Sequence, residues 1–322
     1  MTTSETIPST FALTPGGVQR LAPVLFLLVL CLIFALANSN FATFGNLQNL
    51  VLASSILLII ASASTFVILL GCIDLSVGAI VSLSGITAAL LVPSLGAGAV
   101  VVSVAVGLAV GIINGALHVG LRIPSFLVTL GTMTAIGGVA LLLNDGRPIP
   151  IVHPTFKFLV SGTLIPGVPN IGLWAVAVYL ILVLVDRRTL FGRHVMTIGG
   201  GERTASLIGI PVGLRKIEAF AISGAAAGFA GALLTARLQT AAIAMGEGLN
   251  LQAIATIVIG GTFITGGVGG VARTLTGVLV VVVLSNGLDL LAVHPYVQTV
   301  IKGAMVLVAV MAMNDRRLSI LK

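Results

Sequence analysis

Long stretches without charge, separated by short polar links, dominate the chain. Apart from cysteine thiols, no ionisable group lies between Leu21 and Ile73, and between Leu75 and Leu121 only His118 could carry a charge. A helix needs about 20 apolar residues to cross the hydrocarbon core of a membrane. Dividing the charge-free stretches by that length, at their Gly, Pro, Asn and Ser residues, predicts ten transmembrane spans. These spans cover residues 21–38, about 50–70, two spans within 75–121 divided at 93–98, then 124–143, about 170–185, 219–239, 251–265, 274–291 and 296–313.

The predicted fold is an all-α polytopic membrane protein with about ten transmembrane helices, some of them short or broken. Composition agrees, because 16 Lys or Arg and 9 Asp or Glu in 322 residues fall far below the roughly one quarter of charged residues in soluble domains. A soluble globular enzyme is therefore excluded. The segment Ala35-Leu36-Ala37 resembles a signal-peptide cleavage site, but the region before Arg20 lacks a basic start, so we interpret 21–38 as a span.

The positions of the cations orient the predicted spans. Ten spans place both termini on one side, and most Lys and Arg residues fall on that side, which the positive-inside rule assigns to the cytoplasm. These cations are Arg20, Arg122, Arg187, Arg188, Arg193, Arg203, Arg215, Lys216, Arg273, Arg316, Arg317 and Lys322. Arg147 and Lys157 lie opposite, and Arg237 and Lys302 lie at or within span ends. We therefore expect a cytoplasmic tail at 1–20, a transmembrane domain at 21–313 and a cytoplasmic tail at 314–322. The sequence pI of about 10.3 then reflects orientation, and we expect no nucleic-acid partner.

Motifs for catalysis and metal binding are absent from the sequence. There is no GxxxxGK[ST] phosphate loop, HExxH helix, GxSxG turn, metal-spaced Cys/His set or paired-carboxylate arrangement. Cys31 and Cys72 fit no disulfide, metal or redox spacing. We therefore predict no catalytic residue, no metal site and no cofactor bound by this chain. Any energy for transport must come from elsewhere.

Two glycine-rich runs interrupt the apolar pattern. Residues 71–78 (Gly-Cys-Ile-Asp-Leu-Ser-Val-Gly) place Asp74 where two predicted spans meet. Asp74 could be an intramembrane polar site or an N-cap that satisfies free amides of the third span. Residues 259–270 are too rich in glycine for one uninterrupted helix, which fits either tight packing with a turn or direct contact with a solute.

The last predicted hairpin carries one acid and one base. Asp289 and Lys302 lie on its opposite arms, at depths that differ by roughly 4 Å at a rise of 1.5 Å per residue. An ion pair between them is the expectation. The alternative is that Lys302 snorkels alone to the interface.

Four motifs, in order along the chain, carry a family resemblance. Residues 71–78 look like G-G-I-D-L-S-V-G, with Cys72 in place of a glycine, and residues 111–115 and 123–131 are similar to G-x-x-N-G and P-x-F-I-x-T-L-G. Residues 198–210 look like G-G-N-x-x-A-A-x-x-S-G-I, and Asn286, Gly287, Leu288 and Gln298 also fit. From about Phe41 to Met313 the chain resembles the permease subunits of bacterial ABC importers for ribose, xylose, arabinose and galactofuranose. Those permeases are related to the branched-chain amino-acid permeases.

The resemblance implies a multi-pass subunit of the bacterial cytoplasmic (inner) membrane, surrounded by lipid. Its partners would be a second permease chain, a cytosolic ABC ATPase that holds ATP and Mg, and a periplasmic sugar-binding protein. Residues 186–218 would be a cytoplasmic coupling loop that docks on the ATPase, although a basic solvated link would show the same charges. The candidate coupling residues are Gly199, Gly200, Glu202, Arg203, Ala205, Gly209 and Ile210.

The function implied is inward movement of a monosaccharide by alternating access. Polar or aromatic character within the matched motifs selects a candidate translocation path, although core packing explains each residue equally well. This set comprises Asp74, Asn114, Ser125, Phe126, Thr129 and Asn286. Alternatives are a permease for branched-chain amino acids and an ion-coupled secondary transporter. The latter needs interior carboxylates, for which only Asp74 and Asp289 are present.

Several positions depart from the family pattern. Asn250 and Gln252 stand where the family has the carboxylates of E-L-D-A-I-A, Gly201 replaces an asparagine, and Ile208 replaces a serine. Residues 271–274 replace a segment normally V-x-G-T. These changes leave open whether the chain pairs with itself or with a different permease chain.

Overall fold

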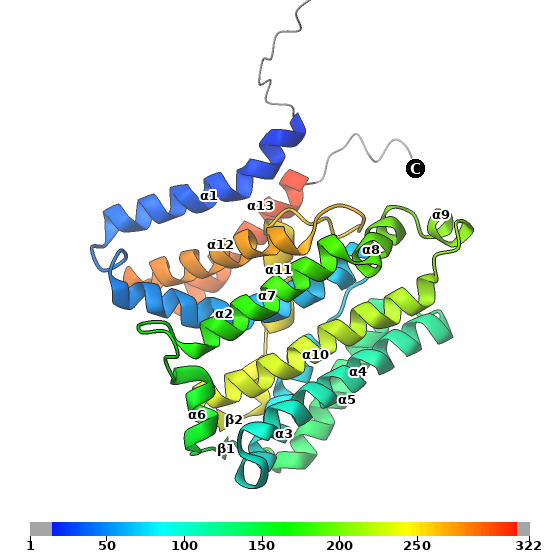
Figure 1. Cartoon of the computed structure of the whole chain (residues 1–322). Coiled ribbons are helices and arrows are strands. Elements are labelled where there is room, and N and C mark those ends of the chain that lie inside the picture. The colour runs from blue at the N-terminus through cyan, green and yellow to red at the C-terminus, as the bar shows by residue number, and fades with distance from the viewer. Residues whose placement is uncertain (1–14, 314–322) are drawn as a thin grey trace, which may run out of the picture.

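The computed structural model describes residues 15–313, and nearly all of them lie in helices (Figure 1). The helices are α1 (Pro15–Ala37), α2 (Phe44–Leu69), α3 (Val77–Leu95), η1 (Gly96–Gly98), α4 (Ala99–Leu121), α5 (Ser125–Asn144), α6 (Pro154–Ser161), α7 (Asn170–Arg188), α8 (Leu190–Gly200), α9 (Glu202–Leu207), α10 (Val212–Leu238), η2 (Ile243–Gly246), α11 (Leu249–Ile259), α12 (Val271–Leu290) and α13 (Pro295–Met313). Two strands, β1 (Ile149–Pro150) and β2 (Thr240–Ala241), pair antiparallel with Ile149 opposite Ala241.

A helix is present at each predicted span. Within residues 15–313, six helical segments are long and apolar enough to cross a membrane: α2, α5, α7, α10, α12, and the joined α3–η1–α4 segment. Shorter apolar segments lie at Ala22–Ala37, Ile243–Ile259 and Pro295–Val308. The chain is therefore a helical, multi-pass membrane protein. The count of ten crossings stays a prediction, and the expected tails at 1–14 and 314–322 lie outside the described residues.

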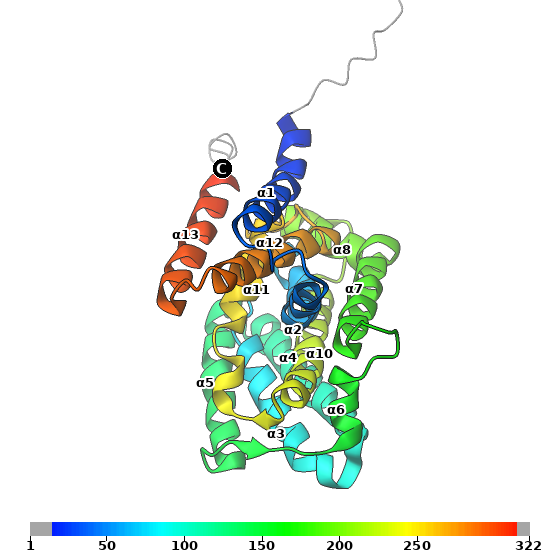
Figure 2. The same ribbon diagram turned by 90° about the vertical axis from the view of Figure 1, so that its left-hand side faces the viewer.

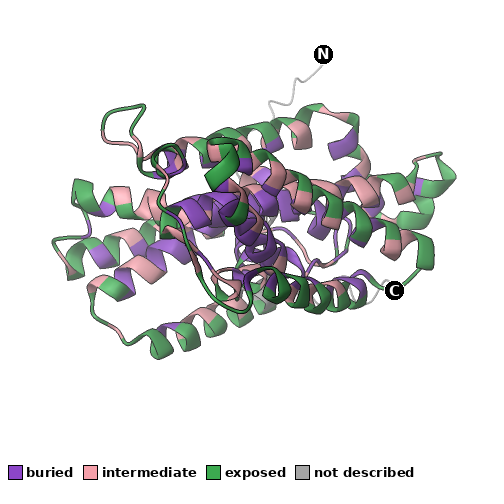
Figure 3. Cartoon of the chain, turned by 90° about the horizontal axis from the view of Figure 1, so that it is seen from below, coloured by how far each residue is buried: buried purple, intermediate pink, exposed green. Residues whose placement is uncertain are grey.

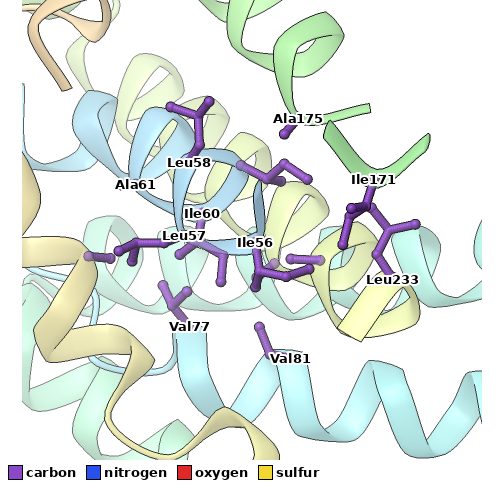
Figure 4. Close-up of a cluster of buried hydrophobic side chains, with 14 of the residues drawn as sticks. Ile56, Leu57, Leu58, Ile60, Ala61, Val77, Val81, Ile171, Ala175 and Leu233 are labelled. Atoms are coloured by element: carbon purple, nitrogen blue, oxygen red, sulfur yellow. The ribbon is translucent and has the colours of Figure 1, made fainter. Parts of the chain in front are cut away.

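The core is centred on α2. Every residue of α2 from Ser55 to Leu69 is buried, as expected for a helix that is apolar on all sides. It contacts α10, α12, α7 and α11, and Figures 1 and 2 show it enclosed among them. Figure 4 shows Ile56, Leu57 and Ile60 of α2 facing Val77 and Val81 of α3. The view from below shows the buried residues gathered in the middle of the bundle, with exposed residues on the outer helices (Figure 3).

Glycines let α4 and α10 approach closely. Gly107 and Gly111 of α4 face Gly224 and Gly228 of α10, so that a Cβ on Gly224 would lie 2.9 Å from the Gly111 Cα. Backbones that touch in this way have no room for side chains between them. Part of the high glycine content is thus explained by packing.

Residues 186–218, predicted to be a loop, are mostly helical. α7 continues to Arg188, α8 and α9 follow, and α10 begins at Val212, seven residues before the predicted span. Thr189 caps α8, its side chain accepting from Gly192 N at 3.3 Å. The interruption predicted at 259–270 is confirmed, since α11 ends at Ile259 and α12 begins at Val271.

Candidate functional site

The chain between α2 and α3 is a helix break inside the protein. Residues 70–76 are not helical, and backbone groups freed at membrane depth need partners from neighbouring segments. Ser125 Oγ of α5 accepts from Ile73 N, and Thr129 Oγ1, one turn further along α5, accepts from Leu75 N, both at 3.0 Å. Asn250 Nδ2 of α11 donates to Leu75 O at 3.0 Å. Side chains from α5 and α11 therefore fix the path of the break.

Asp74, within the break, accepts hydrogen bonds from the residue before α3 and from α10. Its Oδ1 accepts from Ser76 N at 2.9 Å and from Ser76 Oγ at 2.6 Å, and its Oδ2 accepts from Ser223 Oγ of α10 at 3.2 Å. Asn114 Nδ2 of α4 donates to Ser76 Oγ at 2.8 Å. The Asp74 side chain is buried and binds the residue that precedes α3. The N-cap residue of α3 is Ser76, which makes no side-chain cap hydrogen bond, so the interpretation of Asp74 as the N-cap is wrong. Asp74 instead fixes the turn before α3 and joins it to α10.

The predicted path residues fall into separate places. Asp74, Asn114, Ser125 and Thr129 meet around residues 73–76. Phe126 is 46% exposed and lines a cavity of about 280 Å³, the inner cavity, which opens beside the break. The other residues of that cavity are Leu70, Gly71, Cys72, Ile73, His118, Pro124, Ser125, Glu202 and Lys216.

Asn286 lies far from this group. Its amide pairs reciprocally with that of Asn46, at 2.9 and 2.8 Å between nitrogen and oxygen atoms. Both residues line a larger cavity of about 590 Å³ between α2, α10, α11, α12 and α13, here called the outer cavity.

Sequence reasoning overlooked two hydroxyls and the role of one amide. Ser64 Oγ of α2 lies 3.2 Å from Ser223 Oγ of α10, extending the Asp74 cluster. The available signal was a small polar residue within an otherwise apolar span. Asn250 was noted only as a departure from the family. Its amide donates to Leu75 O, which an ionised carboxylate cannot do.

Segment α8–α9 is anchored on one face and exposed on the other. Phe191, Val195 and Ile198 are buried, at the spacing that places side chains on one face of a helix, and the Phe191 ring packs edge-on against Phe66 of α2 at 5.2 Å. By contrast, Leu207 is 80% and Ile208 is 66% exposed. Two neighbouring aliphatic side chains are therefore exposed at the end of α9.

The predicted coupling residues divide between these two faces. Gly200, Glu202, Arg203 and Gly209 are exposed, Ile210 is half-buried, and Ala205 is buried. Glu202 forms an ion pair of 2.8 Å with Lys216 at the start of α10.

Gly199 faces the interior. A Cβ there would meet Leu69 O and Gly267 N, whereas one on Gly200 would meet nothing within 4 Å. Gly267 N itself donates to Leu69 O at 2.9 Å. The end of α8, the end of α2 and the loop before α12 therefore touch through their backbones.

The ion pair expected between Asp289 and Lys302 is not formed. Asp289 Oδ1 accepts from Gln298 Nε2 at 2.7 Å, and that same amide donates to Val293 O at 3.0 Å. Gln298 lies nearer than Lys302 to the turn between α12 and α13, and its amide bonds to Asp289 before that turn and to Val293 within it. The described residues contain no group of three or more His, Cys, Asp or Glu arranged to hold a metal ion.

Comparison with known proteins identifies the family. The family model described as "Branched-chain amino acid transport system / permease component" matches residues 46–310. The chain is 38% identical to the ribose import permease protein RbsC of Bacillus subtilis, over 94% of this chain and 95% of that protein. It is 33% identical to RbsC of Escherichia coli K12 (98% and 100%) and 34% identical to the L-arabinose ABC transporter permease protein AraH of Azospirillum brasilense (94% and 91%). No solved structure matches the chain. With a match over most of its length, the chain belongs to the branched-chain amino acid transport system / permease component family.

Proposed function

We propose that the chain is the membrane-spanning permease subunit of an ABC importer that moves a monosaccharide inward by alternating access. Two of the similar proteins are named as import permeases for ribose and one as a permease for L-arabinose. The few interior charges fit a neutral solute, because a fixed charge inside a membrane is costly and favours ions. The chain has no phosphate loop, so ATP and Mg belong to a cytosolic ATPase partner.

The observation that carries this proposal is the backbone contact between segment α8–α9 and the helix break. The exposed Leu207 and Ile208 are the surface on which the ATPase docks, and the buried face of α8 moves with them. At the end of α8 that adjoins α9, Gly199 contacts Leu69, the last residue of α2 before the break. Both Glu202, from α9, and Ile73, from the break, line the inner cavity. A displacement of α8–α9 therefore reaches residues 70–76 and, through Ser125 and Thr129, α5.

The topology that we propose has ten spans with both termini in the cytoplasm of a bacterial cell. The membrane is the cytoplasmic membrane, and a second permease chain completes the path. A periplasmic sugar-binding protein delivers the solute to the end of the bundle opposite α8 and α9. The bias of cations toward one side supports this orientation.

A permease for branched-chain amino acids is the second candidate. The description of the matching family favours it, whereas the ribose and arabinose relatives favour a sugar. An ion-coupled transporter is a weaker third, since both carboxylate oxygens of Asp74 accept hydrogen bonds from protein groups.

The test is uptake by the purified complex. We expect the chain to co-purify with an ATPase chain and, in vesicles with the binding protein outside and ATP inside, to accumulate a labelled pentose or hexose. Leucine in place of the sugar tests the second candidate. Accumulation by this polypeptide alone, without any ATPase, would show the proposal to be wrong.

A further inference from the structure

The outer cavity lies at the end of the bundle away from α8 and α9. Leu69, the last residue of α2, adjoins Gly199 of α8, and Asn46, which lines the cavity, is 23 residues earlier on the same helix. At 1.5 Å per residue the two ends are about 35 Å apart. The cavity measures about 590 Å³, within the range of about 300–1,000 Å³ typical of small-molecule sites.

The lining of the outer cavity is part apolar and part polar. Four of its aliphatic members are buried, with Ile56 and Leu57 on α2 and Val281 and Val282 on α12. The polar and charged members are Asn46, Asn49, Arg237, Gln252, Ser285, Asn286, Asp289 and Lys302. From Asn46 to Leu57 the cavity follows about 16 Å of α2.

Some of the polar groups are already engaged. Asn46 and Asn286 bind each other, and Arg237 Nη1 donates to Leu52 O at 2.9 Å. Asp289 receives one hydrogen bond, from Gln298. These contacts hold the side chains that line the outer cavity in place.

Other polar groups are available to a solute. Within the part of the chain that the structure describes, the side chains of Asn49, Gln252 and Lys302 make no hydrogen bond to a protein group. Each amide offers one donor and one acceptor group, Lys302 offers donors, and Asp289 has a free Oδ2 acceptor. Asn49, Gln252 and Asp289 are exposed and Lys302 is half-buried, so all four side chains are accessible to a polar ligand that enters the cavity.

The mixture of groups selects the chemistry of the ligand. A hydroxyl both donates and accepts, so vicinal hydroxyls match the side-chain amides of Asn49 and Gln252. Arg237 and Lys302 against Asp289 leave one positive charge, which disfavours a cationic solute. We propose that the outer cavity is a binding site, within a single chain, for a neutral polyhydroxylated solute on its way through the membrane. Asn49, Gln252 and Asp289 are its recognition residues.

This inference rests on the proposed function and names where the sugar is held. The site lies in the outer cavity of one subunit, away from the Asp74 cluster. It also gives a role to Gln252, one of the two amides found where the family has carboxylates, since an amide adds a donor that a carboxylate lacks.

Protection of introduced cysteines from a small hydrophilic thiol reagent tests the site. In the assembled importer with Cys31 and Cys72 replaced by alanine, Asn49→Cys and Gln252→Cys are labelled with and without a sugar that the wild-type importer transports. The matched control is Asn40→Cys, because Asn40 is exposed before α2 and does not line the cavity. We expect millimolar sugar to slow labelling several-fold at positions 49 and 252 and to leave position 40 unchanged.

Several results would overturn the site. They are equal labelling with and without sugar at 49 and 252, slowing of the same size at position 40, or slowing by inorganic phosphate or an anionic phospholipid in place of sugar. Uptake kinetics give a second readout, since Asn49→Ala and Gln252→Ala should raise the half-saturating sugar concentration at least several-fold while ATP hydrolysis continues. If the wild-type complex imports no sugar, the proposed function fails. If it imports sugar and both positions behave as the control, only this site fails.

Discussion

The contact of Gly199 with the end of α2 provides the sharpest test of how the parts are connected. Gly199→Ala places a methyl group against Leu69 O and Gly267 N, and 3.0 Å from the Gly267 Cα. All three atoms belong to the backbone, so no flexible side chain can move aside. Gly200→Ala is the matched control, one residue along the same helix, where the methyl group meets nothing within 4 Å.

Two effects of opposite sign act on the free energy of unfolding of Gly199→Ala. Overpacking a tight contact costs about 1–3 kcal/mol, while alanine in place of glycine favours a helix by about 0.8–1 kcal/mol. Only the favourable effect applies to Gly200→Ala, reduced by its position at the end of α8. With roughly 2–4 °C per kcal/mol for domains of 150–250 residues, we expect Gly199→Ala to unfold several degrees below Gly200→Ala.

Two measurements on the same samples complete this test. Thermal unfolding in lipid nanodiscs reports stability, and the ratio of sugar imported to ATP hydrolysed, at equal amounts of assembled complex, reports coupling. We expect Gly199→Ala to lower both and Gly200→Ala to lower neither. Equal midpoints and equal ratios for the two variants would refute the close contact between α8, α2 and the loop before α12.

Three further predictions follow from named contacts. Thr129→Val removes the acceptor of Leu75 N and should lower the free energy of unfolding by about 1–3 kcal/mol. The control Thr134→Val should be nearly neutral, because the exposed Thr134 hydroxyl bonds only to Leu130 O. Equal thermal midpoints for the two variants would contradict the role of Thr129 in fixing the break. Leu207→Ser with Ile208→Ser should leave stability unchanged and weaken ATPase binding by at least about 100-fold, since two buried aliphatic side chains together contribute about 3–6 kcal/mol. Unaltered affinity in a pull-down titration would contradict docking of the ATPase on these two residues. Glu202→Gln should lower the free energy of unfolding by no more than about 1 kcal/mol, because Glu202 is more than half exposed. The difference from wild type should vanish in 1 M salt, which screens exposed charges. A difference that persists in 1 M salt points to another role for Glu202.

The positions of the helices followed from the amino-acid sequence. A gap of about 20 apolar residues between polar links defines a membrane helix almost regardless of its neighbours, so the structure has a helix at each predicted span. The glycine-rich run at 71–78, which overlaps the break, and the interruption at 259–270 were also visible, because clustered glycines weaken a helix and a carboxylate within an apolar span is rare.

Contacts between spans were decided by the tertiary structure. A charge-free span carries little information on which side faces which neighbour, so the meeting of Ser125, Thr129 and Asn250 at one break could not be read from spacing. The pairing of Asp289 with Gln298 instead of Lys302 depends on the turn that brings Gln298 back. Likewise, the separation of Asn286 from the Asp74 cluster, and the outer cavity beside it, depend on how five helices pack. The sequence determined which segments form apolar helices, because their composition depends little on their neighbours. The packing of the helices determined which polar groups meet, because side-chain fit sets the rotation and the neighbours of each helix.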